Sequence, residues 1–317
     1  MLSAERRSEQ SALPIGVFDS GLGGLDVAAA ISKLLPDERL LYWGDNARVP
    51  YGTKSSKIVQ TYAYEAGRSL VDRGVKAVVI ACNTASAVVD LNALSVELGV
   101  PVFGMIEAGV RACDTALSDR GSSTTQAHIV VLATPGTIAS HAYQDALSSH
   151  DAELRVSAIA CPLIVPLVEA GWARHELAPQ IIAAQLEERE VADRLRVSLS
   201  QDEAHEPIVL LGCTHYPLIA DAIRRGFELS VGRTPMCVDG AESAAHMIKS
   251  YLQSSGLSAH PDADLKRHSA HLAYFTDDLS GAASLELAQY FWQDRGGVGD
   301  LELLSAGALS DDATSAS

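Results

Sequence analysis

The sequence predicts an α/β protein made of two pseudo-symmetric parallel-sheet domains. Short apolar runs alternate with longer amphipathic runs over most of the 317 residues. Strands that alternate with helices in this way are typical of parallel sheets with helical crossovers. Hydrophobic residues make up 47% of the chain but aromatic residues only 5%, so we expect cores built from Ala, Val, Leu and Ile. Two pairs of strand-like runs also end in similar polar turns, which indicates two related halves.

Six apolar runs are typical of buried parallel strands: 15–18, 40–43, 77–81, 128–133, 208–211 and 236–238. The amphipathic runs between them predict helices over 25–35, 55–73, 85–98, 139–148, 176–190, 217–225 and 241–253. Ligands of open parallel sheets bind beyond the carboxyl ends of the strands. The residues of a functional site are therefore expected in the turns that follow these strands.

Three segments read as peripheral to the two domains. Residues 1–13 are short and polar and predict a loose arm rather than an export leader. Residues 191–206 are charged and turn-rich, which predicts an exposed insertion. The tail from about residue 296 is rich in Gly, Ser, Ala and Asp, so we expect it to be loosely attached.

Charge and cysteine usage narrow the class of protein. A net charge of −16 argues against a nucleic-acid partner and against an anionic membrane surface. No apolar run approaches the roughly 20 residues of a membrane span. The five cysteines are an odd number and form no CxxC pair. Together these features predict reduced thiols in the cytoplasm rather than a disulfide framework.

A weak internal repeat pairs two polar turns with two cysteines. In the first half, one strand ends at Asp19 and another at Cys82; in the second half, one ends at Thr134 and another at Cys213. We expect the two halves to face each other across an active-site cleft, each supplying one thiol from a strand end.

Cys82 opens a helix-like run and is followed by Asn83 and Thr84. A helix N-terminus favours the thiolate and lowers the pKa of a cysteine. Asn83, Thr84 and the nearby amides could hold a carboxylate beside the thiol. The alternative is a small buried cysteine with no role beyond packing.

The second cysteine belongs to the run Gly-Cys-Thr-His-Tyr-Pro over 212–217. In extended chain, Cys213 and His215 lie on the same side, so the imidazole could control the protonation of the thiol or donate to a substrate. His215 could instead be a core histidine or half of a metal site. A metal site would need further Cys or His ligands, and no second cluster has the spacing, so we disfavour it.

Two glycine-containing turns follow the first two strands. The turn over 19–24 fits neither the dinucleotide fingerprint nor a P-loop. Asp19 is therefore either a functional carboxylate or the N-cap of the next helix. The turn over 45–52 either lines a pocket or is an ordinary loop.

The remaining candidate groups carry weaker signals. Cys113, Cys161 and Cys237 lack a strand-end context and are interpreted as packing residues. Glu169 is either a surface acid or a pocket acid. No lysine lies in a strand-end turn, which argues against a Schiff base or pyridoxal phosphate.

Together these motifs resemble the glutamate racemase family, within the aspartate/glutamate racemase superfamily. The matching stretches are 18–24, 45–52, 81–86, 132–137, 162–169 and 211–218, and the most specific of them is the run over 212–217. The resemblance extends from about residue 14 to 293. It implies a first domain of residues 14–108 plus 220–295, a second domain of 109–219, and loose termini over 1–13 and 296–317.

The resemblance also implies an activity. Such enzymes interconvert L- and D-glutamate without pyridoxal phosphate or metal, and D-glutamate feeds peptidoglycan synthesis, cell-wall biogenesis and cell shape. Glutamate is then the expected partner, a cytoplasmic location is expected, and a homodimer is left open. By the family pattern Cys82 deprotonates the D-enantiomer and Cys213 the L-enantiomer, and Asp19, Glu169 and His215 assist. The implied substrate contacts are Asp19, Ser20, Tyr51, Gly52, Asn83, Thr84, Thr134, Thr137, Thr214 and His215.

The chemistry of inversion suits a pair of thiols. A stereocentre that inverts through a planar carbanion needs a base on one face and an acid on the other. An α-proton is far less acidic than a thiol, so hydrogen bonds to the enediolate-like carboxylate must supply much of the rate. Three alternatives stay open: a racemase for aspartate or another amino acid, a Cys213–His215 hydrolase that leaves Cys82 unexplained, and a non-catalytic binding protein.

Overall fold

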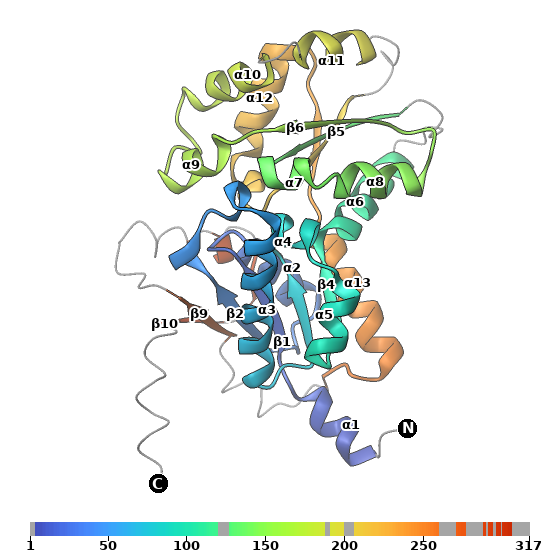
Figure 1. Ribbon diagram of the computed structural model, residues 1–317, viewed down its shortest axis with the longest axis vertical. Helices are drawn as coiled ribbons and strands as arrows, with labels where there is room; N and C mark the ends of the chain where they lie inside the picture. Colours follow the sequence, from blue (N-terminus) through green and yellow to red (C-terminus); the bar gives the residue numbers. More distant parts are fainter. Residues whose placement is uncertain are drawn as a thin grey trace. The chain divides into compact units, whose positions relative to one another are not determined.

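The computed structural model describes residues 4–119, 127–187, 191–199, 206–259, 271–276, 288–289, 291–293, 296–298 and 300–305 (Figure 1). The chain divides into two compact units. The first consists of Met1–Gly104 and Ala244–Ser317, and the second of Met105–Ser243. Each unit is built around its own parallel sheet.

The first unit contains a six-stranded sheet in the order β10-β9-β2-β1-β3-β4. Its strands are β1 (Ile15–Asp19), β2 (Leu40–Gly44), β3 (Ala77–Ile80), β4 (Val102–Gly104), β9 (His271–Phe275) and β10 (Leu301–Ser305). Its helices are α1 (Ala4–Ser11), α2 (Leu25–Leu34), α3 (Ser56–Asp72), α4 (Asn83–Val88), α5 (Leu91–Leu98), most of α13 (Ala241–Ser255), and the short 3₁₀ helices η1 (Asn46–Arg48) and η2 (Tyr51–Thr53). Strands β1, β2 and β3 are buried along their whole length, as in sheets covered on both faces.

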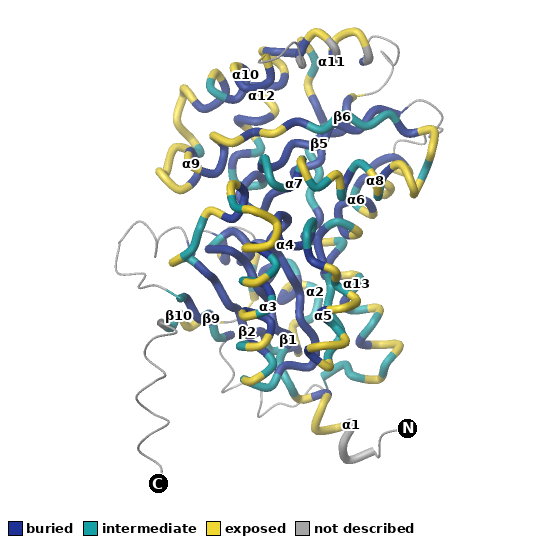
Figure 2. Tube along the Cα trace, viewed as in Figure 1, coloured by how far each residue is buried: buried dark blue, intermediate teal, exposed yellow. Residues whose placement is uncertain are grey.

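The second unit contains a four-stranded parallel sheet in the order β6-β5-β7-β8. Its strands are β5 (His128–Ala133), β6 (Arg155–Ala160), β7 (Ile208–Gly212) and β8 (Met236–Val238). Its helices are α6 (Met105–Asp119), α7 (Pro135–Ala139), α8 (Ala142–His150), α9 (Ile164–Glu169), α10 (Ala178–Glu187), α11 (Val191–Leu199), α12 (Ala220–Val231) and the 3₁₀ helix η5 (Tyr216–Ile219). Two apolar clusters flank the sheet, one under α9 to α12 and the other under α6 and α8. In Figure 2 strand β5 is dark blue, whereas β6 is mostly of intermediate exposure and the helices of this unit also carry exposed segments.

All six predicted strands are present, and the described part of the chain contains four that the sequence analysis missed: β4, β6, β9 and β10. Strand β4 is only three residues long, and β6 is half-buried along most of its length, so neither reads as a long apolar run. The helical run predicted over 85–98 is two helices, because the Asp90 carboxylate caps α5 by accepting from the amide of Ala93 at 3.0 Å. The run over 139–148 is also broken, at His141, whose φ is 60°.

The expected domain boundaries differ from the observed ones. Residues 220–243 belong to the second unit rather than the first, and the first crossing lies at Gly104 rather than residue 108. Strand β8 pairs with β7 from Ile208 and Met236 onward, which fixes this segment to the second sheet. Helix α12 packs closely on α10: a Cβ placed on Gly226 would lie 2.8 Å from the side chain of Ile182.

The segments expected to be loose carry regular structure. The arm over 1–13 contains α1, and the carbonyl oxygen of Ser11 accepts from the buried Lys76 ammonium at 2.8 Å. The supposed insertion contains α11, whose Leu195 and Leu199 are buried in a core cluster; residues 200–205 lie outside the described residues. The tail contributes β10, which pairs with β9, and residues from 306 onward are likewise outside that range.

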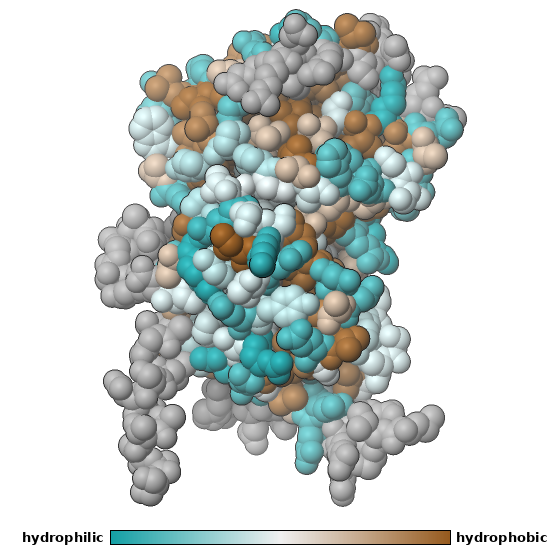
Figure 3. All heavy atoms as spheres, viewed as in Figure 1, coloured by the Kyte–Doolittle hydropathy of each residue, from teal (hydrophilic) through white to brown (hydrophobic). Residues whose placement is uncertain are grey.

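Surface composition is mixed. Hydrophilic and hydrophobic residues are interspersed on the face drawn in Figure 3. Exposed large apolar residues are spread over several helices, among them Ile58 of α3, Val96 of α5 and Leu229 of α12. Within the described residues, no helix combines the length and the apolar character that crossing a membrane requires.

Candidate active site

Each sheet reverses its strand order at one place, and the predicted cysteines lie there. In the first unit β1 has β2 on one side and β3 on the other, so Asp19 and Cys82 follow neighbouring strands. In the second unit β5 and β7 are neighbours, so Thr134 and Cys213 follow adjoining strand ends. Such switch points are where open α/β sheets bind ligands. The expected pairing of one polar turn with one cysteine is therefore present in both units.

In the first unit Cys82 is the N-cap residue of α4, followed by Asn83 and Thr84 in the first turn. All three are buried. The Cys82 thiol donates to the hydroxyl oxygen of Ser20, with Sγ and Oγ 3.6 Å apart. When the sulfur is a thiolate, the same hydroxyl can rotate and donate to it. Ser20 is therefore placed to stabilise the base form of Cys82.

Asp19 is fully buried at the end of β1. Its Oδ2 accepts from the backbone N–H of Gly21 at 3.0 Å. Gly24 passes so close that a Cβ there would lie 2.5 Å from the Cβ of Asp19. Only glycine fits at this position, so Gly24 permits the close approach of the backbone to Asp19.

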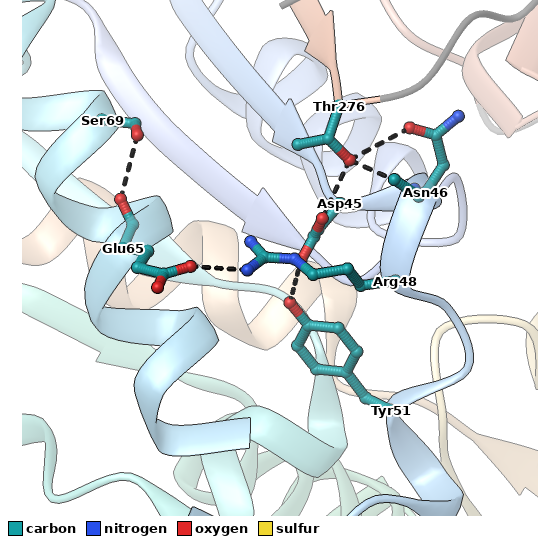
Figure 4. Close-up of polar contacts among 8 residues, drawn as sticks. Asp45, Asn46, Arg48, Tyr51, Glu65, Ser69 and Thr276 are labelled. Atoms are coloured by element: carbon teal, nitrogen blue, oxygen red, sulfur yellow. Dashed lines mark hydrogen bonds and ion pairs between the residues drawn. The ribbon is translucent and has the colours of Figure 1, made fainter. Parts of the chain in front are cut away.

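The turn over 45–52 is organised by the buried carboxylate of Asp45 (Figure 4). Asp45 accepts from the hydroxyl of Tyr51, from Nε of Arg48 at 2.6 Å and from Oγ1 of Thr276 at 2.8 Å. Arg48 also pairs with Glu65 at 2.5 Å. Tyr51 is 1% exposed and its hydroxyl proton is held by Asp45, so its side chain anchors this turn. A substrate contact by Tyr51 and Gly52 would therefore have to come from their main chain.

In the second unit the site centres on Cys213 at the end of β7. His215 forms a hydrogen bond with Cys213, and its Nε2 lies 3.3 Å from Oε1 of Glu169 at the end of α9. Burial alone would lower the pKa of His215, but the hydrogen bonds and negative charges of Cys213 and Glu169 outweigh it and raise the pKa to about 10. His215 is therefore an imidazolium at neutral pH. Glu169, left open by the sequence, is part of this cluster.

Hydrogen bonds in the turns after β5 and β7 hold the surroundings of Cys213 in place. Thr134 caps α7: its Oγ1 lies 3.4 Å from the amide of Thr137 and 3.0 Å from the Thr137 hydroxyl. Thr214 is buried beside Cys213. The hydroxyl of Tyr216 donates to the carbonyl oxygen of Cys161 at 2.8 Å, which ties the turn after β7 to the end of β6. No sequence pattern indicates this tyrosine contact.

The other three cysteines are in packing environments. Burial raises the pKa of Cys113 and of Cys161 to about 12, and that of Cys237 to about 11. These thiols therefore stay protonated at neutral pH. Among the residues that the structure describes, no three His, Cys, Asp or Glu side chains are grouped so that they could hold a metal ion.

The α/β fold with two parallel sheets matches that of solved racemase structures. The family model of Asp/Glu/hydantoin racemases matches residues 23–248, and the chain belongs to this family. It is an amino-acid racemase, an enzyme of the isomerase class. Family membership decides against the hydrolase and the non-catalytic binding protein.

Within that family the relatives are glutamate racemases. The one from Geobacter metallireducens is 40% identical over 265 residues, which cover 84% of this chain and 87% of that protein. The crystal structure of the Francisella tularensis glutamate racemase in complex with D-glutamate has a TM-score of 0.73 and 29% identity, covering 93% of this chain and 97% of that one. The Thermus thermophilus enzyme has a TM-score of 0.68 and 34% identity, covering 95% of this chain and all (100%) of that one.

Proposed function

We propose that this protein interconverts L- and D-glutamate by a two-base mechanism in which Cys82 and Cys213 each serve one face of the substrate. The observation that carries the proposal is the twinned placement of the two thiols. Cys82 follows β3, which neighbours the strand that ends at Asp19. Cys213 follows β7, which neighbours the strand that leads into Thr134. Each also has its own polar partner, Ser20 for Cys82 and His215 for Cys213. The choice of glutamate over aspartate is supported by the relatives, which are glutamate racemases.

On the first side, Cys82 removes the α-proton of D-glutamate and returns a proton to the carbanion formed from L-glutamate. Its position at the start of α4 places the positive end of the helix dipole near the sulfur. Ser20 and Asp19 assist the proton transfer, and Asn83 and Thr84 donate to the substrate carboxylate. These donors matter most in the carbanion, where negative charge moves onto that carboxylate.

On the second side, Cys213 removes the α-proton of L-glutamate. The imidazolium of His215 stabilises the negative charge of a thiolate beside it, and Glu169 holds the imidazolium in place at 3.3 Å. A histidine that keeps its proton to about pH 10 is poorly suited to accept the thiol proton at neutral pH. We therefore assign His215 an electrostatic role beside Cys213, together with substrate contacts from Thr214, Thr134 and Thr137.

The reaction as proposed uses no cofactor, since the proton moves between carbon and sulfur alone. The enzyme would act in the cytoplasm, and its product D-glutamate would feed peptidoglycan synthesis. Glutamate is the one small-molecule partner that the proposal requires.

The test is the fate of the α-hydrogen in deuterated solvent. With L-glutamate as substrate, early D-glutamate should carry one solvent deuterium at Cα, because the second thiol has already exchanged with solvent. Unreacted L-glutamate should gain almost none, and the pattern should invert with D-glutamate. Rapid deuterium uptake into unreacted L-glutamate would instead indicate a single base and end the two-thiol proposal.

Cysteine variants provide the matched control. Cys82→Ser and Cys213→Ser should each reduce racemisation by roughly 10³-fold or more, because a hydroxyl is far less acidic than a thiol and its base form is scarcely present at neutral pH. Cys113→Ser, in the helix α6 of the second unit, should keep the activity of the folded enzyme. A Cys82→Ser variant with near-normal turnover in both directions would contradict the assignment.

A further inference from the structure

Tyr42 is a buried tyrosine on the middle of β2 whose hydroxyl reaches the turn that carries Asp19 and Ser20. It is 1% exposed and pairs with Val17 of β1. Its hydroxyl donates to the carbonyl oxygen of Gly21 at 2.8 Å. Its oxygen also interacts with the backbone N–H groups of Gly24 and Leu25, at the start of α2. One phenol oxygen thus links the middle of the turn to the helix that follows it.

Gly21 is the residue through which this link reaches the reacting groups. Its carbonyl oxygen is held by Tyr42, and its N–H donates to the carboxylate of Asp19 at 3.0 Å. The preceding residue, Ser20, accepts from the thiol of Cys82 with the two atoms 3.6 Å apart. A movement of the Gly21 peptide therefore shifts Asp19 and Ser20 relative to Cys82.

The hydroxyl of Tyr42 keeps its proton throughout the working range of the enzyme. Burial, and then the nearby negative charges of Asp19 and Cys82, raise the pKa of Tyr42 well above its ordinary value. The group is therefore a permanent donor to Gly21 rather than an acid or base in the reaction. Its place beneath the turn is also tight: a Cβ on Gly44, two residues further along β2, would lie 2.6 Å from the Gly21 carbonyl oxygen.

We propose that Tyr42 is a positioning residue for the Cys82 half of the reaction, holding the Gly21 peptide so that Ser20 and Asp19 stay aligned with the thiol. The inference rests on the proposed two-cysteine mechanism. Removing the hydroxyl leaves the buried carbonyl oxygen of Gly21 without this donor, so the turn must rearrange to satisfy it. A displacement of about 1 Å in a reacting group can cost on the order of 10²-fold in rate. Tyr42→Phe should therefore lower kcat/KM by about 10- to 100-fold.

Loss of rate alone does not separate positioning from general damage, but isotope effects do. The equilibrium constant of a racemase is one, so kcat/KM must fall equally in the two directions. When the Cys82 step becomes slow, the primary isotope effect on kcat/KM should rise with D-[2-²H]glutamate, whose α-deuterium Cys82 removes. It should fall toward the smaller equilibrium effect with L-[2-²H]glutamate, because the Cys213 step then becomes reversible before Cys82 delivers its proton.

Two matched variants complete the design. Tyr216→Phe removes a buried hydroxyl that ties down the Cys213 turn, and it should shift the two isotope effects in the opposite sense. Tyr274→Phe, on the neighbouring strand β9 with its ring 6.3 Å from that of Trp43, should leave both isotope effects unchanged. If Tyr42→Phe fails to fold, Gly44→Ala replaces it, since its methyl group would press on the same Gly21 carbonyl without removing the hydroxyl.

The outcomes separate this inference from the mechanism on which it rests. Isotope effects that move in opposite senses for the two enantiomers, and oppositely in Tyr42→Phe and Tyr216→Phe, support the positioning role. A Tyr42→Phe enzyme whose isotope effects equal those of the wild type, or change together, overturns it. The deuterium-incorporation pattern of the wild-type enzyme tests the two-base mechanism independently of any tyrosine.

Discussion

The ion pair between His215 and Glu169 gives a prediction whose size follows from the geometry. Replacing Glu169 with Gln removes one of the negative charges that raise the pKa of His215. The carboxylate lies 3.3 Å from Nε2, but its side chain is 39% exposed, so solvent screens the attraction. A pair of this kind contributes about 0.2–1 kcal/mol. At about 1.36 kcal/mol per pKa unit, the pKa of His215 should fall by roughly 0.2–0.7 unit.

The larger part of the shift should survive the substitution, because it comes from Cys213. The assay is an NMR titration of the ¹⁵N-histidine-labelled enzyme, followed by kcat/KM for L-glutamate across the same pH range. His215 of the wild type should titrate near pH 10, and the basic limb of the activity should move down with it in Glu169→Gln. Glu176→Gln, at an exposed position just before α10, is the control and should leave both unchanged.

The sign of the stability effect also follows. The folded-state pKa of His215 is raised above its unfolded value of about 6.5, so the associated stability is fully present below that pH. It is lost as the pH rises through about 10. Glu169→Gln should therefore lower the free energy of unfolding slightly at pH 6 and have little effect above pH 10. A wild-type His215 that titrates at or below 6.5, or a drop of more than two units in the variant, would refute this account of the site.

Three further outcomes are expected. Lys76→Met should lower the free energy of unfolding by about 3–5 kcal/mol in urea titrations, because it leaves the buried carboxylate of Glu38 without its cation. In the wild type this carboxylate is 3% exposed and lies 2.5 Å from the ammonium. Unchanged stability would contradict a tight ion pair. Gly24→Ala should lower kcat/KM at least about tenfold, because its Cβ would lie 2.5 Å from the Cβ of Asp19. Near-normal kinetics would show that the turn is not constrained as described. Exhaustive chelation should leave racemisation unchanged, and a loss that added zinc restores would count against a cofactor-free reaction.

The sequence by itself determined the elements that carry the strongest local signals. β-Branched runs such as 128–133 predict buried strands, and their alternation with amphipathic runs predicts parallel sheets. The candidate thiols could also be chosen from sequence, because Cys82 and Cys213 each follow a predicted apolar strand and open a polar turn. No strand was predicted before Cys161, although the structure places this cysteine directly after β6. Burial raises the pKa of Cys113 and of Cys161, which agrees with their interpretation as packing residues.

The tertiary structure decided what depends on pairing between distant segments. The tail that reads as loose becomes β10 because its main chain finds a partner in β9, a contact with no local signal. Residues 220–243 join the second unit because β8 pairs with β7, although the family resemblance implied that they belong to the first. The hydrogen bonds that hold the turns of the site also depend on contacts between distant segments. In sequence, Tyr42 and Tyr216 look like ordinary core residues, because the apolar ring of a tyrosine favours burial. The partner of each hydroxyl is set only when the chain folds and brings separate strand ends and turns together.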